Sequence, residues 1–338
     1  MSDPASPMAD VATATAAIEP IAPDAVPEAA GAPPPPQAGA ASGRRAWLLT
    51  DAPASRAQAA WGRRYQAWLA FRRNPLAMAG LGVILLMLLL ILLAPVLATH
   101  DPGIQELGNR LAAPSSAHWL GTDELGRDVW SRLLYGGRIT LGMVVAVVLL
   151  VAPVGLLVGC VAGYAGGLWD RLLMRVTDVF LAFPRLILAL AFVAAMGPGV
   201  ESAVIAIALT AWPPYARLAR AETLTIRHTD YVAAARMTGA SPARVVLRHV
   251  LPMCLPSLVV RVTLDMSSII LTAAGLGFLG LGAQPPLPEW GTMIATARRF
   301  ILEQWWVAVM PGVAIFAASL AFNLLGDGLR DVLDPKQR

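Results

Sequence analysis

The chain has 338 residues, of which 57% are hydrophobic and only 14% are charged, with a mean hydropathy of +0.60 and a net charge of +4. A soluble domain usually carries roughly 25% charged residues, so a large part of this chain must face lipid or other protein instead of water. The composition therefore excludes an ordinary soluble enzyme and predicts an all-α membrane protein.

Few residues could carry catalysis or bind a cofactor. The single lysine, Lys336, lies near the C-terminus with no glycine-rich loop before it, which excludes the phosphate-binding loop of common ATPases. The histidines, at positions 100, 118, 228 and 249, have no metal-ligand spacing, and two cysteines make no disulfide framework. No Ser-Lys, paired Asp or His-metal set of an intramembrane hydrolase is apparent either. We predict that this chain holds no catalytic residue, no cofactor and no metal.

The N-terminal region differs in composition from the rest. The first 43 residues hold nine prolines and no basic residue, which predicts a disordered Ala/Pro-rich tail over residues 1–55. Residues 56–75 mix arginines with Trp61, Tyr65, Trp68 and Phe71, which predicts a basic amphipathic lead-in at a membrane surface. The apolar run that follows argues against nucleic acid as its partner.

Six apolar stretches are candidate transmembrane helices. The first, residues 76–98, would form a helix of roughly 35 Å, enough to cross a hydrocarbon core of about 30 Å. The others are residues 139–162, 179–196, 200–215, 257–282 and 306–325, which predict a five-helix core over residues 139–330. The third and fourth are the weakest, since Pro184 interrupts one and Trp212-Pro213 ends the other.

Arginines set the expected orientation. Residues 1–75 carry seven arginines and residues 216–250 carry six, whereas residues 197–201 carry none. Because basic residues stay on the cytoplasmic side, both termini are predicted to be cytoplasmic, including the tail at 331–338. Residues 99–138 then become a periplasmic segment. Trp290 and the Trp305-Trp306 pair flank apolar runs, which is typical of aromatic anchors at the headgroup level.

Residues 230–252, which we call the bend segment, form the most informative stretch. An alanine-rich helix would end at Gly239, a residue suited to the left-handed turn after a helix. Ser241 then fits an N-cap and Pro242 the first position of a second helix. The spacing predicts a compact helix-bend-helix unit, which is either a structural surface loop or a knob on which a partner docks.

The bend segment resembles the cytoplasmic coupling loop of ATP-binding-cassette (ABC) importer permeases, whose pattern is E-A-A-x-x-x-G, then nine intervening residues, then I-x-L-P. Ala233 stands where the pattern has Glu, and His249 where it has Ile. The whole coupling loop is expected over residues 216–252. The ATPase-coupling residues that this resemblance implies are Ala233, Ala234, Ala235, Arg236, Gly239, Ser241, Pro242, Arg244, Leu251 and Pro252.

Three further motifs, at residues 118–132, 212–217 and 278–291, resemble signatures of the second (C) type of dipeptide and oligopeptide permeases. The resemblance thus covers about residues 70–335. The residues of the periplasmic signature are Gly121, Thr122, Asp123, Gly126, Arg127, Asp128 and Arg132. Two interpretations stay open: a charge network that braces the outer end of the second span, or a docking surface for a binding protein.

The resemblance implies a six-helix type I ABC importer permease fold in a bacterial inner membrane, importing dipeptides or oligopeptides by alternating access. It implies a homologous B-type permease as heterodimer partner, two ATP-binding subunits that carry ATP and Mg, and a periplasmic substrate-binding protein. Nickel chelates, glutathione or glycosidic compounds are alternative substrates of the same machinery. A stand-alone secondary carrier or channel is the alternative from another class.

Charged residues within the apolar stretches are candidates for the translocation path. Arg261 and Asp265 lie four residues apart on one helical face, and Arg185 follows the helix-breaking Pro184. Charges in lipid mostly face a bundle interior or a water-filled path, where this pair would meet the charged ends of a peptide. The alternative is an ion pair that Arg261 and Asp265 form with each other. Residues 275–280 match G-x-G-x-x-G, but no strand precedes them, so they predict close helix packing.

Overall fold

The computed structural model describes residues 47–50 and 53–333. Within these ranges the regular structure is helical, apart from one isolated bridge between Thr122 and Asp128. Most of the predicted tail at 1–55, and residues 334–338 of the predicted C-terminal tail, lie outside the described residues. The predicted all-α architecture is confirmed.

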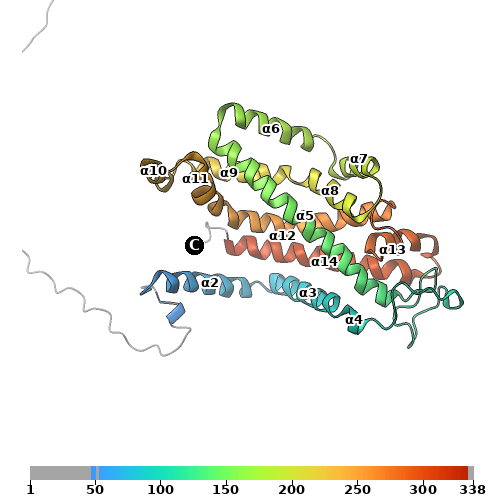
Figure 1. Cartoon of the computed structure of the whole chain (residues 1–338). Helices are drawn as coiled ribbons and strands as arrows, with labels where there is room; N and C mark the ends of the chain where they lie inside the picture. The colour runs from blue at the N-terminus through green and yellow to red at the C-terminus, as the bar shows by residue number, and fades with distance from the viewer. Residues whose placement is uncertain (1–46, 51–52, 334–338) are drawn as a thin grey trace, which may run out of the picture.

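Thirteen α-helices carry the labels of Figure 1 within the described ranges. They are α2 (Arg56–Arg73), α3 (Pro75–Leu92), α4 (Ala94–Leu97), α5 (Val129–Ala165), α6 (Gly167–Leu181), α7 (Arg185–Met196), α8 (Val200–Ala211), α9 (Pro213–Ile226), α10 (Asp230–Met237), α11 (Pro242–Val245), α12 (Leu251–Phe278), α13 (Trp290–Ala297) and α14 (Trp305–Leu333). Short 3₁₀ turns cover Leu107–Asn109 and Arg298–Phe300, and a π-helical turn, η2 (Val246–Val250), joins α11 to α12.

The predicted count of six spans is not confirmed. Among the described residues, four helical stretches are long and apolar enough to cross a membrane: α3, α5, residues 242–278 and α14. A fifth exists if α6 and α7, which meet at 89° around Pro184, form one bent span. The proline breaks the predicted third span, and α8 has only 12 residues, roughly 18 Å, before the chain bends at Trp212.

Side-chain caps set where two of the spans begin. Asn74 ends α2 and caps α3, because its Oδ1 accepts hydrogen bonds from the Leu76 and Ala77 amides at 3.1 Å. Asp128 caps α5 in the same way and accepts from the Ser131 amide at 2.8 Å. As a result α5 begins at Val129, ten residues before the predicted start of the second span at residue 139.

The long helices run between two distinct ends of the bundle (Figure 1). At one end lie α10, α11, α2 and the C-terminal end of α14. At the other end lie α13 and the segment between α4 and α5, residues 98–128, which we call the outer loop. A hydrogen bond of 3.1 Å from Asn74 Nδ2 to Asp331 Oδ2 joins the α2–α3 junction to the end of α14.

A row of three glycines brings α5 and α9 into backbone contact. Gly155, Gly159 and Gly163 recur every four residues on one face of α5, and we call this row the glycine seam. A Cβ atom added at Gly163 would lie 2.8 Å from the Cβ of Thr223, and one at Gly159 would overlap the Ala216 oxygen. Only small residues let two helices approach this closely in lipid. The seam therefore fixes α9 against α5.

One sequence interpretation of the α12–α13 region needs correction. Trp290 is not a headgroup anchor, since it is only 2% exposed and its Nε1 donates to the Leu133 oxygen at 3.0 Å. Gly275 and Gly277 lie inside α12, and Gly277 is in a close helix contact as predicted, because an added Cβ there would lie 3.1 Å from the Thr292 amide nitrogen of α13. Gly277 makes room for the carboxylate of Glu289, and Gly280, with φ of 78°, turns the chain after the helix.

The glycine seam predicts that Gly159→Ala destabilises the protein. The added methyl group would overlap the backbone oxygen of Ala216. Forcing extra atoms into a packed contact typically costs about 1–3 kcal/mol of folding free energy. The matched control is Gly142→Ala on the same helix, where nothing lies within 4 Å of an added Cβ. Thermal unfolding of both variants in detergent should show a lower melting temperature for the first alone. Equal melting temperatures would contradict the seam.

Candidate functional site

The bend segment folds as the sequence predicts locally. Gly239 has φ of 82°, and its amide donates to the Arg236 oxygen at 2.9 Å while the Ala240 amide donates to the Ala235 oxygen at 3.1 Å. This pair of bonds is the Schellman arrangement, which satisfies the last carbonyl groups of α10. Ser241 Oγ then accepts from the Arg244 amide at 3.4 Å, with Pro242 at the first turn of α11. The bend therefore has a defined shape.

Apolar side chains hold this unit against the bundle. Val232, Val245 and Val250 are fully buried, and Val246 nearly so. The guanidinium of Arg236 lies 5.0 Å from the centre of the Tyr164 ring near the end of α5, a cation–π contact. The second helix is not separate, because α11 continues through η2 into α12. The bend is thus continuous with the long apolar helical stretch over residues 242–278.

The tip of the bend segment presents side chains to the outside. Met237 is 89% exposed, and Tyr231 and Leu247 are more than half exposed. Ala233 and Ala234 are exposed beside them, whereas Ala235 and Leu251 are half-buried and Pro252 is exposed. Exposed apolar side chains at the end of a bundle are suited to contact with another protein.

His249, the other departure from the coupling pattern, has a structural partner. Its Nδ1 lies 2.7 Å from the hydroxyl oxygen of Tyr231 at the start of α10, and the two rings meet edge to face at 5.2 Å. The contact joins α10 to η2 across the bend. It gives the two halves of the bend segment a direct side-chain connection in addition to the backbone turn at Gly239.

The predicted path residues converge in a buried polar cluster between α7, α9 and α12. Arg185 Nη1 donates to Asp265 Oδ1 at 3.1 Å, and the Tyr215 hydroxyl donates to Asp265 Oδ2 at 3.1 Å. Asp265 is only 5% exposed and Tyr215 is fully buried. Among the described residues, Arg185 also has two buried nitrogens, Nε and Nη2, without a hydrogen-bond partner. The cluster therefore holds unused donors.

Arg261 does not pair with Asp265, contrary to the ion pair expected from their spacing. Its guanidinium lies 5.9 Å from the centre of the Tyr215 ring, and its Nε is buried without a partner within the described ranges. Asp265 is already occupied by Arg185, a residue 80 positions away in the chain. Arg261 also lines a cavity of about 430 Å³, together with Leu218, Ser257 and Arg330. It thus connects the cluster to an open space between helices.

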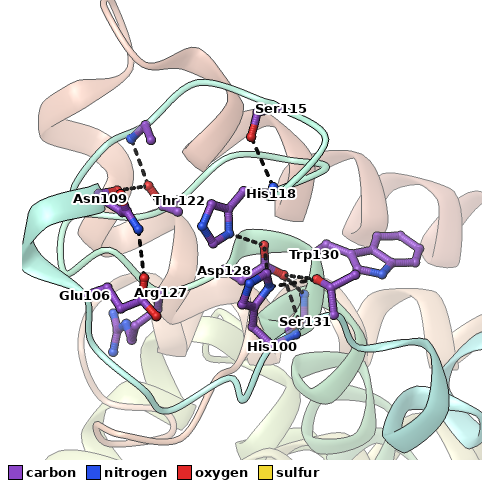
Figure 2. Close-up of polar contacts among 12 residues, drawn as sticks. His100, Glu106, Asn109, Ser115, His118, Thr122, Arg127, Asp128, Trp130 and Ser131 are labelled. Atoms are coloured by element: carbon purple, nitrogen blue, oxygen red, sulfur yellow. Dashed lines mark hydrogen bonds and ion pairs between the residues drawn. The ribbon is translucent and has the colours of Figure 1, made fainter.

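The periplasmic signature folds the outer loop onto the start of α5. Asp123 Oδ1 accepts from the Leu125 and Arg127 amides at 2.9 and 3.0 Å, and its Oδ2 contacts Arg127 Nε at 2.7 Å and Arg132 Nε at 3.3 Å. Thr122 Oγ1 donates to the Asn109 oxygen and accepts from the Ala112 amide (Figure 2). Gly126, with φ of 74°, lies against the Glu106 backbone, where no side chain fits.

Burial favours one of the two interpretations of this signature. Asp123, Arg127, Asp128 and Arg132 are each 2–5% exposed. Side chains this deeply buried have little surface to offer a docking protein, so the geometry favours the bracing network. Because the charges are buried and paired, their removal should cost more than the few tenths of a kcal/mol typical of an exposed pair.

Two functional candidates escaped the sequence reasoning. Tyr215 follows two prolines at the start of α9. A tyrosine buried among helices needs a hydrogen-bond partner for its hydroxyl, and that need was the signal that could have pointed to Tyr215. Glu289 is fully buried, caps α13 by accepting from the Gly291 and Thr292 amides at 2.8 and 2.9 Å, and lies 3.5 Å from Thr140 Oγ1. Burial raises the pKa of Glu289 despite these bonds. Nothing in the sequence places Thr140 beside it.

Comparison with known proteins defines the class. Residues 152–338 match the family described as binding-protein-dependent transport system inner membrane component. Residues 63–114 match the N-terminal transmembrane domain of oligopeptide transport permease C. The chain therefore belongs to this family of inner-membrane transport components, and the predicted inner-membrane location is confirmed.

Three relatives agree with this assignment. The chain is 46% identical to the probable D,D-dipeptide transport system permease protein DdpC of Escherichia coli K12, over 80% of this chain and 90% of that protein. It is 47% identical to the di/tripeptide transport system permease protein DppC of Pseudomonas aeruginosa, over 80% of this chain and 91% of that protein. It is 45% identical to the glutathione transport system permease protein GsiD of an Escherichia coli O6 strain, over 80% of this chain and 90% of that protein. A solved inward-facing MetNI methionine ABC transporter is similar at TM-score 0.49 and 22% identity, over 60% of this chain and 96% of that one.

The buried polar cluster predicts that Asp265→Ala destabilises the protein strongly. The change leaves the Arg185 charge buried without its partner, which typically costs about 3 kcal/mol or more. The matched control is Asp178→Ala, because Asp178 pairs with Arg217 at 2.6 Å but both side chains are more than half exposed. The control should stay within about 1 kcal/mol of the parent.

Thermal unfolding in lipid nanodiscs checks both changes side by side. Adding Arg185→Met to Asp265→Ala removes the unpaired charge and should recover part of the lost stability. Similar losses for the Asp178 and Asp265 variants would show that the cluster does not hold the helices together.

Proposed function

We propose that this chain is the membrane-spanning permease subunit of an ATP-driven importer that carries dipeptides or oligopeptides into the cytoplasm. The observation that carries the proposal is the continuity between the bend segment and the buried polar cluster. α9 begins at the cluster with Tyr215 and leads to the bend, and α12 leads from the bend back to Asp265. The continuous chain from α9 to α12 thus connects the exposed tip of the bend segment, where a partner could bind, to the buried polar cluster between the helices.

The bend segment acts as the coupling element of this proposal. Two ATP-binding subunits, which hold ATP and Mg, would contact its exposed tip, and their closure would push α10 and α11 against the bundle. Because α11 continues into α12, and α9 is fixed to α5 by the glycine seam, the push moves helices as units. Alternating access follows if that movement opens the cluster to one side of the membrane at a time.

The proposed topology places the bend segment and both termini in the cytoplasm. In support, α2, α10 and the end of α14 lie at the same end of the bundle (Figure 1). The outer loop would then be periplasmic, with residues 76–98 as the first span and residues 139–330 as the core of a six-span bundle. α8 and the start of α9, with the bent α6–α7 pair, would supply the third and fourth crossings.

Further partners follow from the same proposal. A homologous B-type permease would cover part of the exposed apolar surface of the bundle and complete the translocation path. A periplasmic substrate-binding protein would deliver the ligand. A cavity of about 520 Å³ at the outer end is lined by Arg110, Arg298, Arg299, Glu124 and Phe278. Its charged rim, and not the buried signature, is the surface that we propose for the binding protein.

Peptides fit the charges of the buried polar cluster. Arg261 and Arg185 carry unused donors that suit a carboxylate, and an amino group would share the carboxylate of Asp265, which already accepts from Arg185 and Tyr215. The names of two relatives specify dipeptides and di/tripeptides. Glutathione is the second candidate, since it carries the same two kinds of charge and a relative is a glutathione permease. Nickel chelates and glycosides have no comparable support.

Co-purification tests the assignment to an importer. The tagged chain is isolated from its own membranes in mild detergent, and its partners are identified by mass spectrometry. We expect a second permease and ATP-binding subunits in the same complex. Isolation of the chain alone, under conditions that preserve other membrane complexes, would favour a stand-alone carrier or channel and would contradict the proposal.

Gly239→Val should uncouple transport. A β-branched residue strongly disfavours the positive φ of this turn, so the tip of the bend would shift relative to α11. Gly239→Asn is the matched control, because asparagine tolerates the left-handed region. Uptake of labelled dipeptide and of glutathione is measured in cells that lack the native copy.

The valine variant should take up ligand at the background level although it inserts normally, and the asparagine variant should stay close to the parent. Undiminished uptake by the valine variant would exclude the bend segment as the coupling element.

A further inference from the structure

The outer loop gathers three potential metal ligands that are far apart in sequence. His100, His118 and Asp128 each offer a ligand atom, and these atoms all lie within 4.8 Å of one another. Spacings of 18 and 10 residues match no standard metal motif, which is why the sequence predicted no such site. The fold of the outer loop over the start of α5 creates the cluster (Figure 2).

The carboxylate of Asp128 is held so that one oxygen serves the histidines. Its Oδ2 accepts from the Ser131 amide and hydroxyl at 2.8 Å each and from Thr99 Oγ1 at 3.2 Å. Its Oδ1 faces the two rings, at 3.0 Å from His118 Nδ1 and 3.9 Å from His100 Nδ1. A carboxylate fixed by hydrogen bonds to its second oxygen is the usual support of a metal ligand.

The spacing of these atoms suits a small divalent ion. Zn²⁺ binds nitrogen and oxygen ligands at about 2.0–2.2 Å, which places neighbouring ligand atoms roughly 3.3 Å apart in tetrahedral geometry. The two distances to Asp128 Oδ1 bracket that value. The ring centroids of His100 and His118 lie 4.5 Å apart, and the His100 side chain is 37% exposed, which leaves its ring room to turn from Thr99 Oγ1 toward the site.

The residues around the three ligands favour a cation, and a cavity gives it access to them. A cavity of about 50 Å³ lies against the three side chains and is also lined by Asp101 and Glu106. The two further carboxylates make the site negative, and the volume admits an ion with a water molecule. Three protein ligands would leave one position for that water.

We propose that His100, His118 and Asp128 bind one divalent first-row transition-metal ion, of which Zn²⁺ is the probe used here. The ion fastens two parts of the outer loop to the N-terminus of α5: the stretch just after α4, which carries His100, and the start of the periplasmic signature motif, which carries His118. Its binding is independent of the proposed transport substrate and of the direction of transport.

Metal content tests the proposal on the complex that co-purifies with the full-length chain, isolated through a tag without histidine. The complex is stripped with a chelator, equilibrated with Zn²⁺, dialysed, and analysed for metal per chain, and the affinity is measured by competition with a chromogenic chelator. We expect His100→Ala and His118→Ala each to lose one bound Zn²⁺ per chain relative to the parent, with affinity reduced about tenfold or more.

Two variants serve as controls, and a third guards against misfolding. His228→Ala and His249→Ala remove the other histidines, which lie next to α10 and α11 in the chain, at the opposite end of the bundle, and should leave the bound Zn²⁺ unchanged. His100→Ala changes a partly exposed side chain and is the variant most certain to fold. Substitution of Zn²⁺ by Co²⁺ in the parent should give visible absorption of nitrogen and oxygen ligation that is absent in His100→Ala.

Zn²⁺ content that is equal in the parent and in both outer-loop variants would overturn the proposal. So would a loss of Zn²⁺ in His249→Ala as large as that in His100→Ala, since the ion would then bind elsewhere. A failed co-purification of ATP-binding subunits would refute the importer assignment without affecting this result.

Discussion

The contact between α5 and α9 is the constraint on which the remaining structure depends. Three glycines bring the two backbones together, so α9 cannot slide without displacing α5. α5 begins at Asp128, where the outer loop is fastened, and α9 leads from Tyr215 to the bend segment. The seam therefore places the outer loop, the buried polar cluster and the bend on one connected pair of helices.

Charge is distributed in a way that supports this arrangement. The exposed basic residues of the bend, such as Arg244, remain at one end, and the paired charges of the signature are buried at the other. Between them, among the described residues, Asp265 is held by Arg185 and Tyr215 while Arg261 faces a cavity. Buried charge is expensive in a membrane protein, so a cluster with unused donors is the expected place for contact with a charged ligand.

How far the sequence predicted this structure depended on whether the signal was local. The turn at Gly239 and the cap at Ser241 are set by neighbouring residues, and the structure shows both. The partner of Asp265 lies 80 residues away, so helical spacing pointed to Arg261 and missed Arg185. The metal-ligand cluster and the buried Trp290 are equally consequences of tertiary contact. The count of six spans is not confirmed, and the uncertainty falls on the two stretches that the sequence marked as weakest, at the breaks of Pro184 and Trp212.

The central claim is that the tip of the bend segment is where the ATP-binding subunits attach. A photo-crosslinking amino acid placed at Met237, which is 89% exposed at that tip, tests it in the intact membrane. The matched position is Leu302, which is 95% exposed near the N-terminus of α14, where that helix meets the opposite end of the bundle. The account predicts an adduct with an ATP-binding subunit from position 237 and none from position 302. An adduct from position 302, or none from position 237 in the assembled complex, would contradict it.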